Sequence, residues 1–298
     1  MKLSWPTILV SLPIAYALDI YVSPSGSDSN AGTFGSPFLT LTKAQTAVRA
    51  AAVSSQLADI TVHIADGVYT LSSPLLFTAA DSGKNGHTVY WTATGSNALI
   101  SGGTKLTGWT LNSTTGIYST TVPKGTQSRN LYIDGWAAQY ARASIDRSTL
   151  SYDNNSITWT ASANDWIASI PGIEYAEIRA VQSFTDRYSG IKSATVGKLI
   201  MDQPAWHNNV WGYDDISHPF SEREFYIQNA LSLLTDGAEY YLDSSAGIIY
   251  YKPLTGQNMA SATAYLGHLE VLIAIGGTYD APAHDIAFQG LNFVGCSH

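Results

Sequence analysis

Side chains that could bind or cleave a sugar are densest between Asp202 and Glu224. This stretch combines carboxylates, imidazoles and flat aromatic rings, and each of these groups can contact a carbohydrate. It ends in Glu222-Arg223-Glu224, a charge pattern that is also typical of a solvated loop. We predict substrate contacts at six of its residues: Trp206, His207, Asn208, Asn209, Trp211 and Tyr213.

Hydrolysis of a glycosidic bond requires two carboxyl groups, about 5 Å apart for retention or roughly 6.5–9.5 Å apart for inversion. No pair of acids in the sequence can be assigned these roles, so the catalytic residues are unknown at this stage. A serine nucleophile is not indicated, because the chain contains no G-x-S-x-G motif.

A metal site is not indicated by the spacing of acids and histidines. Asp214-Asp215 could help to bind calcium, but calcium takes about six to eight oxygen ligands, so turn capping is the favoured role of these two acids. His207 and His218 do not have zinc-ligand spacing. We therefore expect no metal and no cofactor.

One segment has a clear helical pattern. Over residues 40–53, Leu41, Ala44, Val48 and Ala51 recur on one face, and Thr40 is positioned to cap the N-terminus. We expect this amphipathic helix to cover the open edge of the first layer of β-structure, since an uncovered edge would promote aggregation.

Most of the remaining chain reads as short strands separated by turns. Runs of three to five residues rich in apolar side chains occur at Ile60–Ile64, Val68–Leu71, Leu75–Phe77, Thr88–Trp91 and Ala98–Ile100. This spacing suits an antiparallel sandwich or a parallel β-helix. From about Gly108 to Pro253 the pattern becomes antiparallel, with hairpin signals at Asp134-Gly135 and at Asp243–Gly247. The first pattern returns over Glu270–Phe293, and the sequence stops at His298 in the middle of it.

Composition excludes several classes of protein. The 298 residues include 15 Lys and Arg against 23 Asp and Glu, a formal net charge of −8, which argues against a general nucleic-acid-binding surface. No apolar run reaches the roughly 20 residues of a membrane span. With a single cysteine, Cys296, the chain cannot form an internal disulfide framework.

The first 17 residues have the layout of a secretory signal. Lys2 is followed by an apolar stretch, and the segment ends in the small-x-small pattern Ala15-Tyr16-Ala17. We therefore expect a secreted, extracellular protein. In a eukaryotic host, glycans could then be attached at two sequons, Asn112-Ser113-Thr114 and Asn154-Asn155-Ser156.

Several motifs, in this order and spacing, resemble secreted right-handed parallel β-helix carbohydrate-active proteins of the pectin-lyase-like type. They are residues 20–28 (IYVSPSGSD), Gly32-Thr33, residues 36–41 (SPFLTL), residues 100–103 (ISGG), Gly108-Trp109, residues 129–135 (RNLYIDG), residues 239–243 (EYYLD) and residues 249–251 (IYY). Together they are similar to the N-terminal half of glycoside hydrolase family 141, in which a β-rich domain interrupts the β-helix early.

The resemblance implies an all-β chain that starts a right-handed parallel β-helix, with one capping helix and an inserted antiparallel β domain. The expected segments are a signal peptide (1–17), an N-terminal cap with the first coils (18–107), an inserted domain (108–253) and the resumed β-helix (254–298), which would be truncated. In such enzymes the catalytic acids lie on later coils, so the resemblance implies that they lie beyond residue 298.

Three functions are compatible with these features. The first is the N-terminal part of a secreted glycoside hydrolase acting on plant or microbial polysaccharide. The second is a polysaccharide lyase on the same fold, although the few basic residues form no obvious cluster in the sequence. The third is a non-catalytic module that binds carbohydrate or has a structural role. In each case the expected partner is a polysaccharide or oligosaccharide, and the oligomeric state is unknown.

Overall fold

The computed structural model describes residues 17–52, 56–210, 212–219 and 223–297. It divides into two compact units. We call the first the parallel unit (residues up to Gly103, and Leu269–Cys296) and the second the inserted unit (Thr104–His268, with the C-terminal Ser297). The predicted signal segment lies outside the described residues except for Ala17. No helix in the described ranges is long and apolar enough to cross a membrane.

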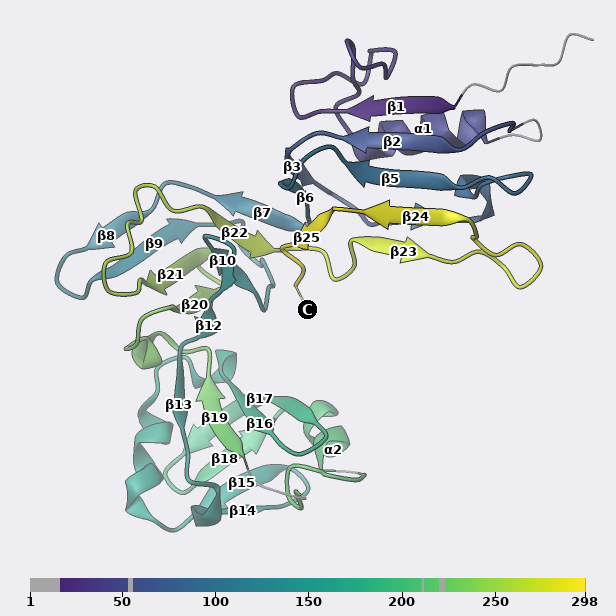
Figure 1. Ribbon diagram of the computed structural model, residues 1–298. Coiled ribbons are helices and arrows are strands. Elements are labelled where there is room, and N and C mark those ends of the chain that lie inside the picture. The colour runs from purple at the N-terminus through teal and green to yellow at the C-terminus, as the bar shows by residue number, and fades with distance from the viewer. Residues whose placement is uncertain (1–16, 53–55, 211, 220–222, 298) are drawn as a thin grey trace, which may run out of the picture. The chain divides into compact units, whose positions relative to one another are not determined.

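The parallel unit consists of three parallel sheets (Figure 1). The first contains β1 (Leu18–Val22), β2 (Ile60–Ile64), β5 (Val89–Ala93) and β24 (Ile286–Gln289), paired in that order. The second contains β3 (Gly67–Thr70), β6 (Ala98–Ser101) and β25 (Asn292–Val294), and the third contains β4 (Leu75–Phe77) and β23 (Ile273–Ile275). The chain therefore visits the three sheets in turn, and it leaves for the inserted unit between β6 and β23.

The register of β5 sets the layers of the core. Val89 pairs with Ile60 on one side and with Ile286 on the other, all in parallel. Because side chains alternate between the two faces of a strand, equivalent apolar residues stack above one another inside the unit. Trp91 is 1% exposed, and its ring lies 5.3 Å from that of Phe77, edge to face. Phe77 makes the same edge-to-face contact with Phe288, so the aromatic stack continues into the segment that follows the insertion.

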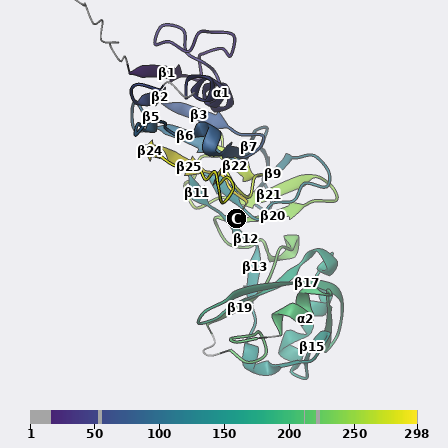
Figure 2. The ribbon, with the colours of Figure 1, turned by 90° about the vertical axis from the view of Figure 1, so that its right-hand side faces the viewer.

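The predicted helix is confirmed. Helix α1 (Leu41–Ala51) starts at Thr40, whose hydroxyl accepts a hydrogen bond from the backbone N–H of Lys43. Leu41, Ala44 and Val48 are buried in the same core as β1 and β2. The helix lies beside the first strands of the parallel unit in both views (Figures 1 and 2).

The inserted unit contains three further sheets. The strand order of the first sheet is β11 (Trp136–Ala137), β10 (Leu131–Ile133), β22 (Ala264–Gly267) and β7 (Gly103–Leu106). The order of the second is β12 (Gln139–Tyr140), β20 (Glu239–Asp243), β21 (Ile248–Lys252), β9 (Ile117–Thr121) and β8 (Thr110–Asn112). The order of the third, which has seven strands, is β13 (Arg142–Ser144), β19 (Glu224–Gln228), β16 (Glu177–Val181), β17 (Asp186–Thr195), β18 (Lys198–Met201), β15 (Ser156–Trp159) and β14 (Leu150–Tyr152). The seven-stranded sheet is antiparallel, whereas β12 and β20 pair in parallel.

Helical segments are short. Apart from α1 they are α2 (Ala205–Asn209) and the 3-10 turns η1 (Ala79–Asp81), η2 (Arg147–Thr149), η3 (Ser162–Ser169), η4 (Ile173–Tyr175) and η5 (Leu231–Leu233). The chain is thus mostly β, as predicted, with parallel and antiparallel sheets in different parts. The predicted division into an N-terminal cap with the first coils (18–107), an inserted domain (108–253) and the resumed β-helix (254–298) stays a prediction.

Both predicted hairpins are confirmed. In the first, Ile133 pairs with Trp136 across Asp134 and Gly135, whose φ angles are 51° and 83°. A two-residue turn needs positive φ at both positions, and Asp-Gly meets this need with little strain. In the second hairpin, Asp243 pairs with Ile248.

The inserted unit contains two hydrophobic cores. One lies among β10, β20, β21 and β22 and includes Leu131 and Tyr251. The other lies against the seven-stranded sheet and includes Ile178, Ile227 and Trp206. The side chains described below come from several strands of this unit, among them β12, β13, β16, β17 and β19.

An ion pair between Arg49 of α1 and the buried Asp81 leads to a prediction about stability. The Asp81 carboxylate is fully buried and accepts hydrogen bonds from Arg49 Nε at 2.7 Å and from the backbone N–H of Thr78 at 2.8 Å. We expect Asp81→Ala to lower the free energy of unfolding by about 2–3 kcal/mol, because donors are left unpaired while the half-exposed Arg49 is rehydrated. The control Asp280→Ala, at an exposed position, should change it by less than about 0.5 kcal/mol. Equal losses in denaturant titrations of the two variants would contradict this account.

Candidate functional site

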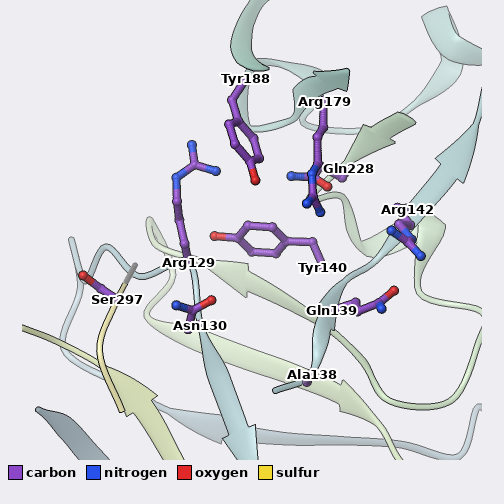
Figure 3. Close-up of a pocket in the computed structure, with 10 residues that line it drawn as sticks. All are labelled: Arg129, Asn130, Ala138, Gln139, Tyr140, Arg142, Arg179, Tyr188, Gln228 and Ser297. Carbon is purple, nitrogen blue, oxygen red and sulfur yellow. The ribbon is translucent and has the colours of Figure 1, made fainter. Parts of the chain in front are cut away.

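A polar cavity of about 360 Å³ opens in the inserted unit (Figure 3). We call it the arginine cavity. It is lined by three arginines, two tyrosines, several amides and small residues: Arg129, Asn130, Ala138, Gln139, Tyr140, Arg142, Arg179, Tyr188, Gln228 and Ser297. Its volume falls in the range of about 300–1,000 Å³ that is usual for small-molecule sites. None of these lining residues is a carboxylate, so the cavity is equipped for binding rather than for acid–base chemistry.

Arg129 is held by a two-pronged ion pair. Its Nη1 and Nη2 donate to the two carboxylate oxygens of Glu177 at 2.7 and 2.6 Å. Gln228 Nε2 donates to Glu177 Oε1 at 2.7 Å and thereby fixes the carboxylate from a second strand. The hydrogen bonds to Glu177 raise the pKa of Arg129, although burial opposes this. The guanidinium is therefore a fixed, permanent positive charge at the edge of the cavity.

Arg179 is held in a similar way. Its Nε and Nη2 donate to the two oxygens of Asp186 at 3.0 and 2.8 Å, and the Tyr188 hydroxyl donates to Asp186 Oδ2 at 3.0 Å. Burial opposes ionisation of Asp186, but the hydrogen bonds from Arg179 and Tyr188 hold the pKa of its carboxyl below the ordinary value. The pair across the β16–β17 hairpin is therefore ionised at neutral pH.

Tyr188 lies between Arg129 and Arg179 (Figure 3). The centre of its ring is 4.6 Å from the guanidinium carbon of Arg129 and 5.3 Å from that of Arg179. Both distances are within the reach of cation–π attraction. One aromatic ring thus separates and orients two like charges.

Tyr140 is held by a ring contact and a hydrogen bond at the edge of the cavity. Its ring stacks on that of Tyr240 with centroids 4.7 Å apart, and its hydroxyl donates to the backbone oxygen of Ser128 at 2.6 Å. Burial raises the pKa of Tyr140 to about 12. At neutral pH the side chain is therefore a neutral phenol.

Arg142 differs from the other two arginines. Its guanidinium stacks over the ring of Tyr226 at 4.3 Å. Among the described residues, no carboxylate lies within ion-pair distance of it. Arg142 also lines a second cavity of about 550 Å³, which Glu239 and Asp236 share. Burial raises the pKa of Glu239, and the backbone N–H of Asp236 donates to its carboxylate at 3.4 Å.

The six residues predicted to contact substrate lie elsewhere, around α2 and the following loop. Trp206 is fully buried in the core, and its indole N–H donates to the backbone oxygen of Asp153 at 2.8 Å. Its ring has no solvent-exposed face, so stacking on a sugar would require local opening. Trp211 lies outside the described residues.

Of the other four predicted residues, His207, Asn208 and Asn209 lie in α2, and Tyr213 lies in the loop that follows it. Arg187 donates to the backbone oxygens of Asn209 and Tyr213 at 3.3 and 3.2 Å. Asn209 also donates to the backbone oxygen of Tyr188. His207, Asn208 and Tyr213 are exposed, and Asn209 is partly exposed. Sugar contact by His207, Asn208, Asn209 and Tyr213 stays a prediction.

The neighbouring acids cap turns. Asp214 accepts from the backbone N–H of Phe184 at 2.8 Å, and Asp215 accepts from the backbone N–H of Ser217 at 2.8 Å. This is the turn-capping role favoured by the sequence over calcium binding. Of the predicted glycan acceptors, Asn112 and Asn154 are both exposed, and glycosylation of either stays a prediction.

The arginine cavity was not among the sites predicted from the sequence. Arg129, Arg142 and Arg179 are far apart along the chain and lie next to or in three different strands. No local sequence motif predicts that these arginines come together, and they do not form a cluster of basic residues in the sequence. One signal was present in the sequence. The Asp134-Gly135 hairpin after Arg129 predicts β10, the strand next to Arg129.

Comparisons with known proteins find a solved structure with a similar fold. A solved structure described as a glycoside hydrolase is similar to this chain, with 25% identity and a TM-score of 0.79 over 94% of the chain. The chain spans about half, 51%, of the length of that neighbour. A complex of XylC with xylose aligns over 94% of this chain and 36% of that one, at 12% identity and a TM-score of 0.41, too low to support an argument. No protein-family model and no curated protein sequence matches the chain.

The likeness to the glycoside hydrolase supports a carbohydrate-active fold for this chain. It covers both the parallel unit and the inserted unit, because almost the whole chain is aligned.

The state of Tyr140 generates a prediction about alkaline pH. An unfolded tyrosine has a pKa of about 10, whereas Tyr140 has a pKa of about 12 in the folded chain. Its contribution to stability is therefore complete below about pH 10 and is lost as the pH rises through about 12. From about pH 8 to about pH 11, the free energy of unfolding should fall by about 1 kcal/mol less in Tyr140→Phe than in the unaltered chain.

The control for this measurement is Tyr279→Phe. Tyr279 is 100% exposed, so this substitution should leave the pH dependence of the free energy of unfolding unchanged. Denaturant titrations at several pH values measure the difference. The same pH dependence in Tyr140→Phe as in the unaltered chain would show that the phenol is solvated.

Proposed function

We propose that this chain is part of a glycoside hydrolase that acts on plant or microbial polysaccharide. The observation that carries the proposal is the likeness to a glycoside hydrolase over 94% of the chain at a TM-score of 0.79. The arginine cavity adds a plausible place for a sugar, since amides, phenols and guanidinium groups are the hydrogen-bonding partners that sugar hydroxyls use.

The parallel unit is proposed to be the beginning of a right-handed parallel β-helix. Three features support this: the sheets are parallel, consecutive strands of the unit from β2 onward belong to different sheets, and pairing partners such as β2 and β5 are one circuit apart. The pairing of β4 with β23 and of β5 with β24 continues the same pattern after the insertion. Membership of glycoside hydrolase family 141 is the finer form of this proposal.

The catalytic carboxylates are proposed to lie outside these 298 residues. In support, the lining of the arginine cavity contains no carboxylate, and Glu177 and Asp186 behind it are engaged in ion pairs. The chain also corresponds to about half of the similar hydrolase. The two later-coil acids expected from the family resemblance would then complete the enzyme.

Secretion is part of the same proposal. It rests on the signal-like layout of Met1–Ala17 and on an extracellular location of the polysaccharide substrate.

A polysaccharide lyase is the second candidate. The specific observation in its favour is the arginine cavity, because a lyase acts next to a uronate carboxylate and needs positive charge near that group. The two reactions differ in their products, since a lyase forms an unsaturated uronide and a hydrolase consumes water.

The proposal is tested on the complete native reading frame, expressed with secretion and incubated with plant and microbial polysaccharides. We expect new reducing ends without the ultraviolet absorbance of an unsaturated uronide. Reducing ends together with that absorbance would indicate the lyase, and saturable binding without any cleavage would indicate a non-catalytic module. Either result would overturn the hydrolase proposal.

A further inference from the structure

The arginine cavity concentrates positive charge in an acidic protein. The chain has a formal net charge of −8, yet three of its arginines line one cavity. Glu177 and Asp186 compensate Arg129 and Arg179, and Arg142 remains without an ion-pair partner among the described residues. A local excess of positive charge in an acidic surface selects for an anionic ligand.

We propose that the arginine cavity is a subsite for an anionic sugar residue, whose carboxylate or sulfate group is bound by Arg142 with help from Arg129 and Arg179. This inference rests on the proposed carbohydrate function and names the substrate class of its binding site. The ligand is a uronic acid residue or a sulfated sugar within a polysaccharide.

Arg142 has the geometry of an anion ligand. The face of its guanidinium is covered by the Tyr226 ring, which leaves the N–H groups in the guanidinium plane. A guanidinium has five N–H donors in a fixed fork that matches the two oxygens of a carboxylate or sulfate. The stacking contact restricts the side chain before the ligand arrives, so less conformational entropy is lost on binding.

Arg129 and Arg179 retain donors for the same ligand. Each uses two N–H groups in its ion pair, with Glu177 and Asp186 respectively, and three remain on each guanidinium. The ion pairs with Glu177 and Asp186 hold the guanidinium groups of Arg129 and Arg179 in place. Figure 3 shows Arg129 and Arg179 on either side of Tyr188, with Tyr140 opposite.

Neutral groups of the cavity suit the rest of a sugar ring. Gln139 and Asn130 supply amide donors and acceptors for hydroxyl groups, and Tyr188 adds an aromatic ring. Tyr140 is a neutral phenol and adds no negative charge that would repel an anion. The cavity thus combines guanidinium groups that can bind an anion with amide groups that can bind hydroxyl groups, and a sugar acid carries both kinds of group.

The inference is tested by calorimetric titration of the chain with methyl glycosides in matched pairs. The anionic members are methyl glucuronoside, methyl galacturonoside and glucose 6-sulfate. The neutral members are methyl glucoside, methyl galactoside and glucose, and inorganic sulfate is titrated separately. We expect at least one anionic sugar to bind at least about tenfold more tightly than its neutral partner, a difference of about 1.4 kcal/mol. Added salt should reduce this preference.

Substitutions of Arg142 test whether this residue causes the preference for anionic sugars. Arg142→Gln should weaken binding of the preferred anionic sugar at least about tenfold. Arg142→Lys should weaken it less, because the charge is kept and the fork is lost. The matched control Arg223→Gln replaces an exposed arginine outside the cavity and should leave binding unchanged. Thermal unfolding of each variant establishes that the fold is retained.

Three results would overturn the inference. Equal binding of anionic and neutral sugars would keep a carbohydrate site and remove its anion specificity. Inorganic sulfate binding as tightly as glucose 6-sulfate would show a site for free anions rather than for sugars. Undiminished anionic-sugar binding in Arg142→Gln would place the ligand elsewhere. Failure of the proposed hydrolase function is recognised separately, as absence of polysaccharide cleavage by the complete reading frame.

Discussion

The bidentate ion pair between Arg129 and Glu177 is the interaction on which the inserted unit depends most. Arg129 lies two residues before β10, which belongs to one hydrophobic core, and Glu177 lies on β16, which belongs to the other. Gln228 on β19 fixes the same carboxylate. Hydrogen bonds from two sides leave the acid without unpaired oxygens, a condition that a largely buried carboxylate must meet. The walls of the arginine cavity follow from this connection, because Tyr188 packs against Arg129 and Tyr140 lies on the segment between the two cores.

The parallel unit obeys a different constraint, the register of its strands. Side chains on β2, β5 and β24 alternate with a period of two, so a slip of one residue would move Trp91 from the core to the solvent face. The strands that pair with β5 in this register are β2, which precedes the insertion, and β24, which follows it. An insertion between β6 and β23 is tolerated because it replaces a corner and interrupts no strand pairing. The inserted segment can therefore vary without altering the strand pairing of the parallel unit.

Local features were predictable from the sequence, and features made by several distant segments were not. Thr40 with the periodic Leu41, Ala44 and Val48 predicts α1 because capping and one apolar face are local properties. Asp134-Gly135 predicts its hairpin because backbone conformation at two residues decides the turn. The arginine cavity depends on the pairing of β16 with β17 and β19, which no short window contains. Trp206 was interpreted as a sugar contact from its polar neighbours, whereas its own packing against distant strands buries it.

The most direct test of the account is a crystal structure of the chain soaked with the methyl uronoside that binds best in solution. The account predicts electron density for the sugar in the arginine cavity, with its carboxylate within hydrogen-bonding distance of the Arg142 guanidinium and its hydroxyl groups near Gln139 and Asn130. Density for the sugar on the loop around His207 and Tyr213, with the arginine cavity empty, would contradict it.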